Sequence, residues 1–98
     1  LAIPHFDNYI ESQRRYNRSS ALRRNGGSHT DQEWFKLKRR FNYCCANEAC
    51  RKAETSQERL TKDHIIPIIS GGTDHISNIQ PLCRSCNSHK GIRIIDYR

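Results

Sequence analysis

Apolar residues recur at helical spacing in the first half of the chain. Trp34, Leu37 and Phe41 take the i, i+3 and i+7 positions that share one face of a helix. Just ahead of them, Thr30 and Glu33 form the T-x-x-E pattern of a capping box, in which each side chain bonds the backbone N–H of the other residue. The pattern therefore predicts a helix from Thr30 to Phe41 whose three apolar side chains belong to the core.

The second half of the chain alternates strand-like and helical patterns. The segments "RLTKDH" and "IQPL" have the length and polarity of short strands, and a Gly-Gly pair marks the loop between them. A helix is predicted from about Arg84 to Lys90, where Gly91 ends it. Together these segments predict a ββα unit over residues 58–91.

A polar, basic segment precedes both patterned regions. From Asp7 to Arg24, "DNYIESQRRYNRSSALRR" is predicted to be a helix without a broad apolar face, and "NGGSH" ends it. We expect residues 1–27 to form a basic, helical arm. The alternative is a solvated arm whose arginines have no particular partner.

The composition limits the chain to one small domain. Of its 98 residues, 35% are hydrophobic and 28% are charged, so the core is small and needs an additional staple. The net charge is +7, and residues 1–40 carry nine Lys or Arg against four acidic residues. This excess favours a polyanionic partner. Four basic residues lie near the end of the predicted helix, where they suit the helix dipole and are free to face phosphate: Lys36, Lys38, Arg39 and Arg40.

The cysteine content favours a metal site over disulfides. There are five cysteines, an odd number, and the chain has neither a signal-like apolar segment nor a stretch of roughly 18–20 apolar residues. A disulfide framework and a membrane protein are therefore disfavoured, and a reduced, cytoplasmic protein with metal-bound thiolates is expected. Because the chain begins at Leu1 and contains no Met, we also expect it to be a fragment or a processed product.

Two cysteine pairs have the spacing of a structural zinc site. Cys45 and Cys50 are separated by four residues, and Cys83 and Cys86 by two, so each pair can bring two sulfurs to one tetrahedral ion. Cys44 competes with Cys45 for the first position. Only one of them should reach the metal, because neighbouring side chains of an extended chain point to opposite sides. We favour Cys45 and expect Cys44 to be a buried free thiol.

The dipeptide Asp63-His64 stands between the two cysteine pairs, at the end of the first predicted strand. One interpretation is an ordinary strand whose polar residues face water. The other is an active site, in which Asp63 holds a cation and His64 takes a proton from water, since imidazole ionises near neutral pH. Asn78, in the loop that follows, is equally ambiguous because Asn often serves only to stabilise a turn.

The order of these features resembles the HNH endonucleases of the ββα-metal class, in their zinc-containing branch. The resemblance covers roughly residues 28–92 and depends on the two cysteine pairs, the D-H dipeptide, the loop Asn and the C-N-x-x-K ending. It implies an α+β, treble-clef-like domain over residues 28–98 with a four-cysteine zinc site, preceded by N-terminal helices. Its parts are the lead-in helix 30–41, the zinc knuckle 44–50 and the ββα unit 58–91.

The resemblance also implies a role for each polar residue of the motif. His64 corresponds to the general base, and Asp63 to a ligand of the catalytic cation. Asn78 corresponds to the residue that pins the loop and orients His64. Asn87 stands where the last His of the family's name would be, as a second ligand, which makes this an H-N-N variant. An amide oxygen beside a carboxylate suits Mg²⁺ or Mn²⁺, whereas the zinc is structural.

These roles imply metal-dependent hydrolysis of DNA that leaves 5′-phosphate and 3′-hydroxyl ends. Double-stranded DNA is the expected partner, and a dimer is compatible with cutting both strands. The alternatives are a non-catalytic zinc module that binds nucleic acid and a zinc domain that binds proteins, of which the second is disfavoured by the charge of +7. Six basic residues are expected to contact DNA phosphates: Arg14, Arg15, Arg18, Arg23, Arg24 and Lys90. For Lys90 the alternative is an ordinary solvated lysine.

Overall fold

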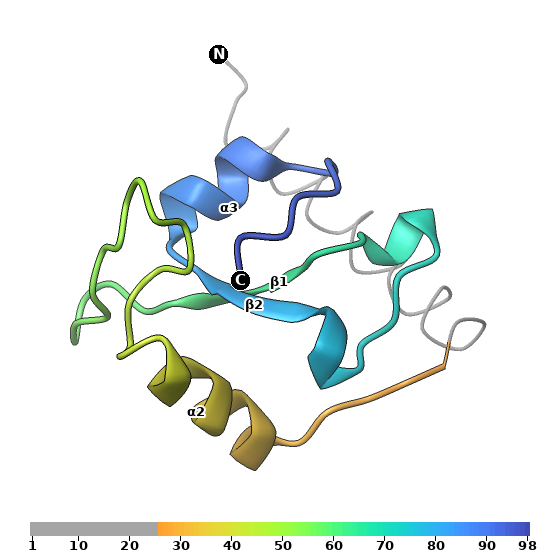
Figure 1. Ribbon diagram of the computed structural model, residues 1–98, viewed down its shortest axis with the longest axis horizontal. Helices are drawn as coiled ribbons and strands as arrows, with labels where there is room; N and C mark the ends of the chain where they lie inside the picture. The colour runs from red at the N-terminus through yellow and green to blue at the C-terminus, as the bar shows by residue number, and fades with distance from the viewer. Residues whose placement is uncertain (1–25) are drawn as a thin grey trace, which may run out of the picture.

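The computed structural model describes residues 26–98, which form two helices and a two-stranded sheet (Figure 1). In chain order the elements are helix α2 (Asp31–Arg40), strand β1 (Thr61–His64), strand β2 (Ile79–Leu82) and helix α3 (Arg84–Lys90). Two 3-10 turns, Ile68–Ser70 and Ile76–Asn78, lie in the loop between the strands. This is the predicted α+β architecture with its ββα unit. Of the basic arm predicted over residues 1–27, residues 1–25 with all five arginines lie outside the described residues.

Helix α2 begins with the predicted capping box. The hydroxyl of Thr30 accepts the backbone N–H of Glu33 at 3.1 Å, and the Glu33 carboxylate accepts that of Thr30 at 2.9 Å. These two bonds satisfy N–H groups that the start of a helix otherwise leaves unpaired. Trp34 and Leu37 are buried together with Ile79 of strand β2, which confirms the predicted apolar face.

Strands β1 and β2 pair antiparallel, and the pairing sorts their side chains onto two faces. Asp63 lies opposite Gln80, and His64 lies opposite Ile79. Because neighbouring residues of a strand point to opposite sides, Asp63 and His64 face opposite sides of the sheet. Figure 1 shows α2 and α3 on opposite sides of the same sheet. Since Ile79 packs on α2, His64 belongs to the α2 side and Asp63 to the α3 side.

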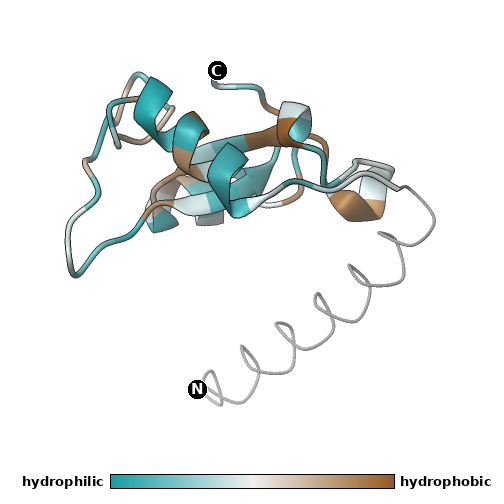
Figure 2. Ribbon diagram, turned by 90° about the horizontal axis from the view of Figure 1, so that it is seen from below, coloured by the Kyte–Doolittle hydropathy of each residue, from teal (hydrophilic) through white to brown (hydrophobic). Residues whose placement is uncertain are grey.

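Two small hydrophobic clusters form the core. The cluster on the α2 side consists of Trp34, Leu37 and Ile79. The other, beside the first turn of α3, consists of Cys45, Ala46, Leu60, Leu82 and Cys83. Half-buried Phe41 packs against both. Figure 2 shows that hydrophobic colour is confined to short stretches and that much of α2 is hydrophilic. Among residues 26–98, no helix has the length and apolar character needed to cross a membrane.

Lys38 is buried rather than exposed near the end of helix α2. Its side chain is 7% exposed, and its ammonium lies 3.1 Å from the carboxylate of Glu54 and 5.4 Å from the ring centre of Trp34. The prediction that Lys38 is free to face phosphate is therefore wrong. Glu54 also accepts the backbone N–H of Leu60 at 2.9 Å. Burial acts to raise the pKa of Glu54, but these hydrogen bonds and the adjacent positive charge outweigh it and lower that pKa.

Replacing Glu54 by Gln should destabilise the fold, because Gln keeps an acceptor for Leu60 but leaves the buried ammonium of Lys38 without a counter-charge. We expect the free energy of unfolding to fall by about 1–3 kcal/mol near neutral pH. Since the pKa of Glu54 is lowered, the effect should be complete above the ordinary value of 4.5 and disappear as the pH falls through the folded-state value. Unfolding in urea at several pH values measures it.

Glu58→Gln is the matched control for this substitution. Glu58 pairs with Lys52, but both side chains are 48% exposed, so solvent screens the pair and its loss should lower the free energy of unfolding much less than the loss of Glu54 does. Equal losses of stability in the two variants would contradict the assignment of Lys38 and Glu54 as a buried pair.

Candidate active site and metal centre

Four cysteines from two distant segments meet at one point. The sulfur atoms of Cys45, Cys50, Cys83 and Cys86 all lie within 4.8 Å of one another. The sulfurs of Cys50 and Cys83 are 3.7 Å apart, close to the roughly 3.8 Å between sulfurs that surround zinc at about 2.3 Å. The donor type and the spacing therefore fit a tetrahedral Zn²⁺, in agreement with the prediction from the cysteine spacing.

Backbone hydrogen bonds hold the first cysteine pair in place. The N–H of Cys45 bonds the carbonyl oxygen of Lys52 at 2.9 Å across the loop of residues 46–51, and the N–H of Ala46 bonds the carbonyl oxygen of Pro81 at 2.8 Å. The second of these bonds ties the knuckle to the end of strand β2. Because Cys83 directly follows that strand, both cysteine pairs are attached to the same strand end.

The pKa values within the cysteine cluster indicate that a cation is needed for all four thiols to ionise. Cys83 caps helix α3, and its sulfur accepts the backbone N–H of Cys86 at 3.4 Å. Burial acts to raise the pKa of Cys83. The hydrogen bond from the Cys86 N–H and those from the neighbouring sulfurs outweigh burial and lower that pKa. Burial raises the pKa of Cys45, and burial together with hydrogen bonds to the other sulfurs raises the pKa of Cys86 to about 12. A bound Zn²⁺ would supply the positive charge that allows all four to be thiolates.

Cys44 stands outside the cluster. Its sulfur lies 3.4 Å from the carbonyl oxygen of Asn42, and its backbone pairs with Ala53. The cluster thus contains Cys45 and not Cys44, as predicted. Cys44 is half-buried, however, so the prediction of a buried thiol is wrong. The chain turns at the surface here, with Asn42 and Tyr43 both in the left-handed region (φ 54° and 58°).

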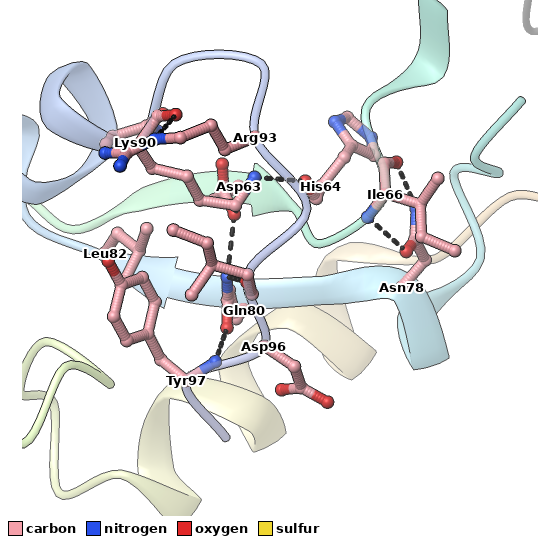
Figure 3. A network of polar contacts seen from close by, with 12 residues as sticks. Asp63, His64, Ile66, Asn78, Gln80, Leu82, Lys90, Arg93, Asp96 and Tyr97 are labelled. Carbon is pink, nitrogen blue, oxygen red and sulfur yellow. Dashed lines mark hydrogen bonds and ion pairs between the residues drawn. The ribbon is translucent and has the colours of Figure 1, made fainter. Parts of the chain in front are cut away.

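On the α3 side of the sheet, Asp63 lies in a buried polar network (Figure 3). Its Oδ2 accepts a hydrogen bond from Nε2 of Gln80 at 2.8 Å, and the ammonium of Lys90 lies 3.2 Å from the same atom. Lys90 also donates to the carbonyl oxygen of His64 at 3.0 Å. The side chains of Asp63 and Lys90 are 6% and 0% exposed, so the pair is shielded from solvent.

Lys90 therefore lacks the solvent-facing position that a direct phosphate contact requires. It shares a helix face with Asn87, as the spacing predicts, but this face packs on strand β1. A buried carboxylate needs a counter-charge, and Lys90 supplies it to Asp63 from the neighbouring helix. Neither a phosphate contact nor a solvated lysine describes Lys90 in this structure.

Asn87 lies one helical turn before Lys90 and also reaches strand β1. Its amide Nδ2 donates to the hydroxyl of Thr61 at 2.7 Å. Asp63 and Asn87 thus lie on the same side of the sheet, and a carboxylate with an amide oxygen fits Mg²⁺ or Mn²⁺ by donor type. The ammonium of Lys90 already compensates the charge of Asp63, so a divalent cation has to compete with it.

Gln80 connects Asp63 to the C-terminal segment. Besides its bond to Asp63, the Nε2 atom donates to the carbonyl oxygen of Ile95 at 2.9 Å, and Oε1 accepts the backbone N–H of Tyr97 at 2.8 Å (Figure 3). Gln80 has no exposed surface, so these bonds hold the C-terminal segment and the Asp63 carboxylate together inside the protein. No feature of "IQPL" beyond a strand pattern points to this role.

On the α2 side of the sheet, His64 contacts Asp74, a residue for which no sequence pattern predicts a role. Nε2 of His64 lies 2.7 Å from Oδ1 of Asp74, which is in the loop between the strands. Nδ1 of His29, which precedes helix α2, lies 2.6 Å from the carbonyl oxygen of Asp74. Since 45 positions separate His29 from Asp74 in the sequence, no local pattern could have paired them.

Asn78 pins the loop between the two strands. Its Oδ1 accepts the backbone N–H of Ile66 at 3.0 Å, and its Nδ2 donates to the carbonyl oxygens of Ile66 at 2.9 Å and Thr73 at 2.8 Å. The loop is so tight that a Cβ on Gly72 would lie 1.8 Å from the Ile66 oxygen, so only Gly fits there. These side-chain bonds match the loop-pinning role that the resemblance implies, but they do not reach the imidazole of His64.

A family model described as HNH endonuclease matches residues 45–97, which is more than half of the chain. The matched region contains the four clustered cysteines, both strands, helix α3 and the C-terminal segment that Gln80 holds. No curated protein and no solved structure matches the chain significantly.

Replacing Cys83 by Ser should unfold the domain, because Cys83 is a member of the four-cysteine cluster that fits zinc and is also the cap of helix α3. We expect one zinc per wild-type chain, and losing a structural zinc removes folding free energy on the order of 10 kcal/mol in zinc-finger-like proteins. Metal analysis together with circular dichroism measures both effects.

Cys44→Ser provides the control for cysteine loss as such. Cys44 lies outside the cluster, so this variant should keep its zinc and its fold. A folded, zinc-free Cys83→Ser protein would show that the cluster does not hold the domain together.

Proposed function

The chain belongs to the HNH endonuclease family, and on this basis we propose that it hydrolyses phosphodiester bonds in double-stranded DNA with the help of Mg²⁺ or Mn²⁺. The observation that carries the proposal is the arrangement at the end of strand β1. There, Asp63 and His64 face opposite sides of the sheet, so one can hold a cation while the other addresses a water. The expected products have 5′-phosphate and 3′-hydroxyl ends.

His64 is the proposed general base. In its neutral form the imidazole takes a proton from the attacking water as the water oxygen approaches phosphorus. The side chain is 10% exposed, which leaves little bulk water around the reacting atoms. Asn78 supports this arrangement by fixing the loop that packs beside His64.

Asp63 and Asn87 are the proposed ligands of the divalent cation. When bound, the cation compensates the negative charge that grows on the phosphate and on the departing 3′ oxygen. The chain itself holds these two side chains ready, since Gln80 bonds the carboxylate of Asp63 and Thr61 bonds the amide of Asn87. The zinc in the cysteine cluster is proposed to support the fold and to take no part in the reaction.

The alternative is a zinc module that binds nucleic acid without cleaving it. One observation favours this alternative: Lys90 already neutralises the carboxylate of Asp63, which a catalytic cation would need as a ligand. A binding module has no need, however, for a buried carboxylate next to a histidine that meets a second carboxylate. The two functions make different predictions for His64, since only the nuclease requires its imidazole for cleavage.

His64→Ala should slow cleavage strongly and preserve binding. The substitution removes the proton acceptor but keeps the backbone carbonyl that Lys90 bonds, so the fold should survive. We expect the cleavage rate to fall by about 10²- to 10⁴-fold, the usual contribution of a positioned general base. The measurement is the conversion of supercoiled plasmid in the presence and absence of Mg²⁺, with affinity for DNA determined on the same protein.

Two further variants make this test specific. His75→Ala removes an exposed histidine from the loop and should cleave like wild type. Asp63→Asn should lose cleavage together with Mn²⁺ binding, whereas His64→Ala should still bind Mn²⁺. Plasmid cleavage by His64→Ala at the wild-type rate, in a preparation free of contaminating nuclease, would exclude the proposed mechanism.

Deleting residues 1–25 should weaken DNA binding and leave the fold intact. This segment contains five of the six residues predicted to contact phosphates, and it lies outside the described residues. Each lost phosphate contact should reduce the slope of log affinity against log salt concentration by roughly 0.9. Salt titrations of full-length and shortened protein measure the slope, and identical slopes would mean that the arm is only a solvated segment.

A further inference from the structure

A polar cluster lies on the opposite side of the sheet from Asp63. It joins His29 from the segment before helix α2, His64 at the end of strand β1, and Asp74 from the loop between the strands. Nε2 of His64 lies 2.7 Å from Oδ1 of Asp74. Nδ1 of His29 lies 2.6 Å from the carbonyl oxygen of Asp74 and 3.5 Å from its Oδ2. Three separate segments of the chain therefore converge on the proposed base.

The cluster is largely shielded from water. The side chains of His29, His64 and Asp74 are 5%, 10% and 20% exposed. A hydrogen bond between an imidazole and a carboxylate is charge-assisted, and exclusion of water strengthens it. At 2.7 Å the bond is at the short end for an N–H donor, so it holds the ring of His64 in one orientation.

The partner of Nε2 determines which tautomer His64 adopts. A neutral imidazole has one hydrogen, on Nδ1 or on Nε2, whereas a carboxylate can only accept. The nitrogen beside Asp74 must therefore carry the hydrogen, which leaves the lone pair on Nδ1. We propose that Asp74 is a positioning residue for His64, which it holds in the Nε2–H tautomer with Nδ1 as the proton acceptor.

This inference deepens the proposed function and depends on it for its role in the reaction. One O–H bond of the attacking water breaks, and its proton passes to Nδ1 of His64. The water oxygen bonds to phosphorus while the bond from phosphorus to the 3′ oxygen breaks, and the 3′ oxygen takes up a proton from solvent. The imidazolium beside the Asp74 carboxylate is stabilised by that charge and then returns its proton to solvent.

Asp74 is itself held in place from two directions. His29 bonds its carbonyl oxygen, and Asn78 bonds the carbonyl oxygen of the preceding residue, Thr73, at 2.8 Å. The segment before helix α2 lies directly against this loop. The packing is so close that a Cβ added to Gly27 would be 3.0 Å from Cβ of Thr73. Asn78 thus acts on His64 through the loop that brings Asp74 to the imidazole.

NMR of the His64 ring nitrogens tests the tautomer directly, in zinc-loaded protein without DNA. At an alkaline pH at which the ring is neutral, wild type should show a protonated Nε2 and an unprotonated Nδ1. Asp74→Ala should show averaging between the two tautomers. An unchanged Nε2–H tautomer in Asp74→Ala would overturn the proposal. Because no cleavage is measured, this result is independent of the proposed function.

A double-mutant cycle tests whether Asp74 acts through His64. Asp74→Ala should lower kcat by about 10- to 10³-fold and leave KM for DNA nearly unchanged. In a His64→Ala background the same substitution should cause no further loss, since no base is left to be positioned. A further loss of similar size in that background would overturn the proposal. If His64→Ala cleaves normally, the proposed function fails while the tautomer measurement still applies.

Two more variants separate positioning from loop damage. His75→Ala changes the next residue of the same loop, whose ring bonds Ser77, and it should leave both the His64 tautomer and kcat unchanged. Asp74→Asn fills nearly the same space without the charge and is used if Asp74→Ala weakens the fold. It should lower kcat at least about tenfold, again only when His64 is present. A wild-type kcat for Asp74→Asn would overturn the proposal.

Discussion

The meeting of four cysteine sulfurs is the constraint on which the remaining structure depends. Helix α3 has seven residues, far fewer than the roughly 12–15 that an isolated helix needs to be stable, so it must be fixed from outside. Cys83 and Cys86 fix its first turn to the same point that holds the knuckle. The helix then places Asn87 and Lys90 against strand β1. The cysteine cluster therefore determines where the polar side chains of helix α3 lie against the sheet.

The polar site divides across the sheet because of the alternation of a β-strand. Asp63 and His64 are adjacent in sequence, yet each has a counter-charge of its own from a different part of the fold. Lys90 of helix α3 faces Asp63, and Asp74 of the loop faces His64. A charge or proton on one residue of the dipeptide is thus balanced on its own side of the sheet. The backbone still joins the two, because Lys90 also bonds the carbonyl oxygen of His64.

Local patterns predict the elements of this fold but not the partners within its site. The capping box, the strand "IQPL" and the helix that ends at Gly91 depend on neighbouring residues, and the structure confirms each. The first strand is two residues shorter than predicted. Lys38 and Lys90 escape prediction because lysine is mostly exposed, and only the folded chain shows that each faces a carboxylate, which is half-buried for Glu54 and buried for Asp63. The contact of His64 with Asp74 depends in the same way on the path of a loop.

Gln80 limits which sequences can build this site. Its amide donates to Asp63 and to the carbonyl of Ile95, and it accepts from the N–H of Tyr97, so donors and acceptor are all in use. Glu at this position would oppose the charge of Asp63 and lose both donors. Leu would leave buried polar groups of the C-terminal segment unpaired. Position 80 therefore admits little besides an amide, and homologous chains that share this arrangement should vary less there than at the exposed surface of helix α2.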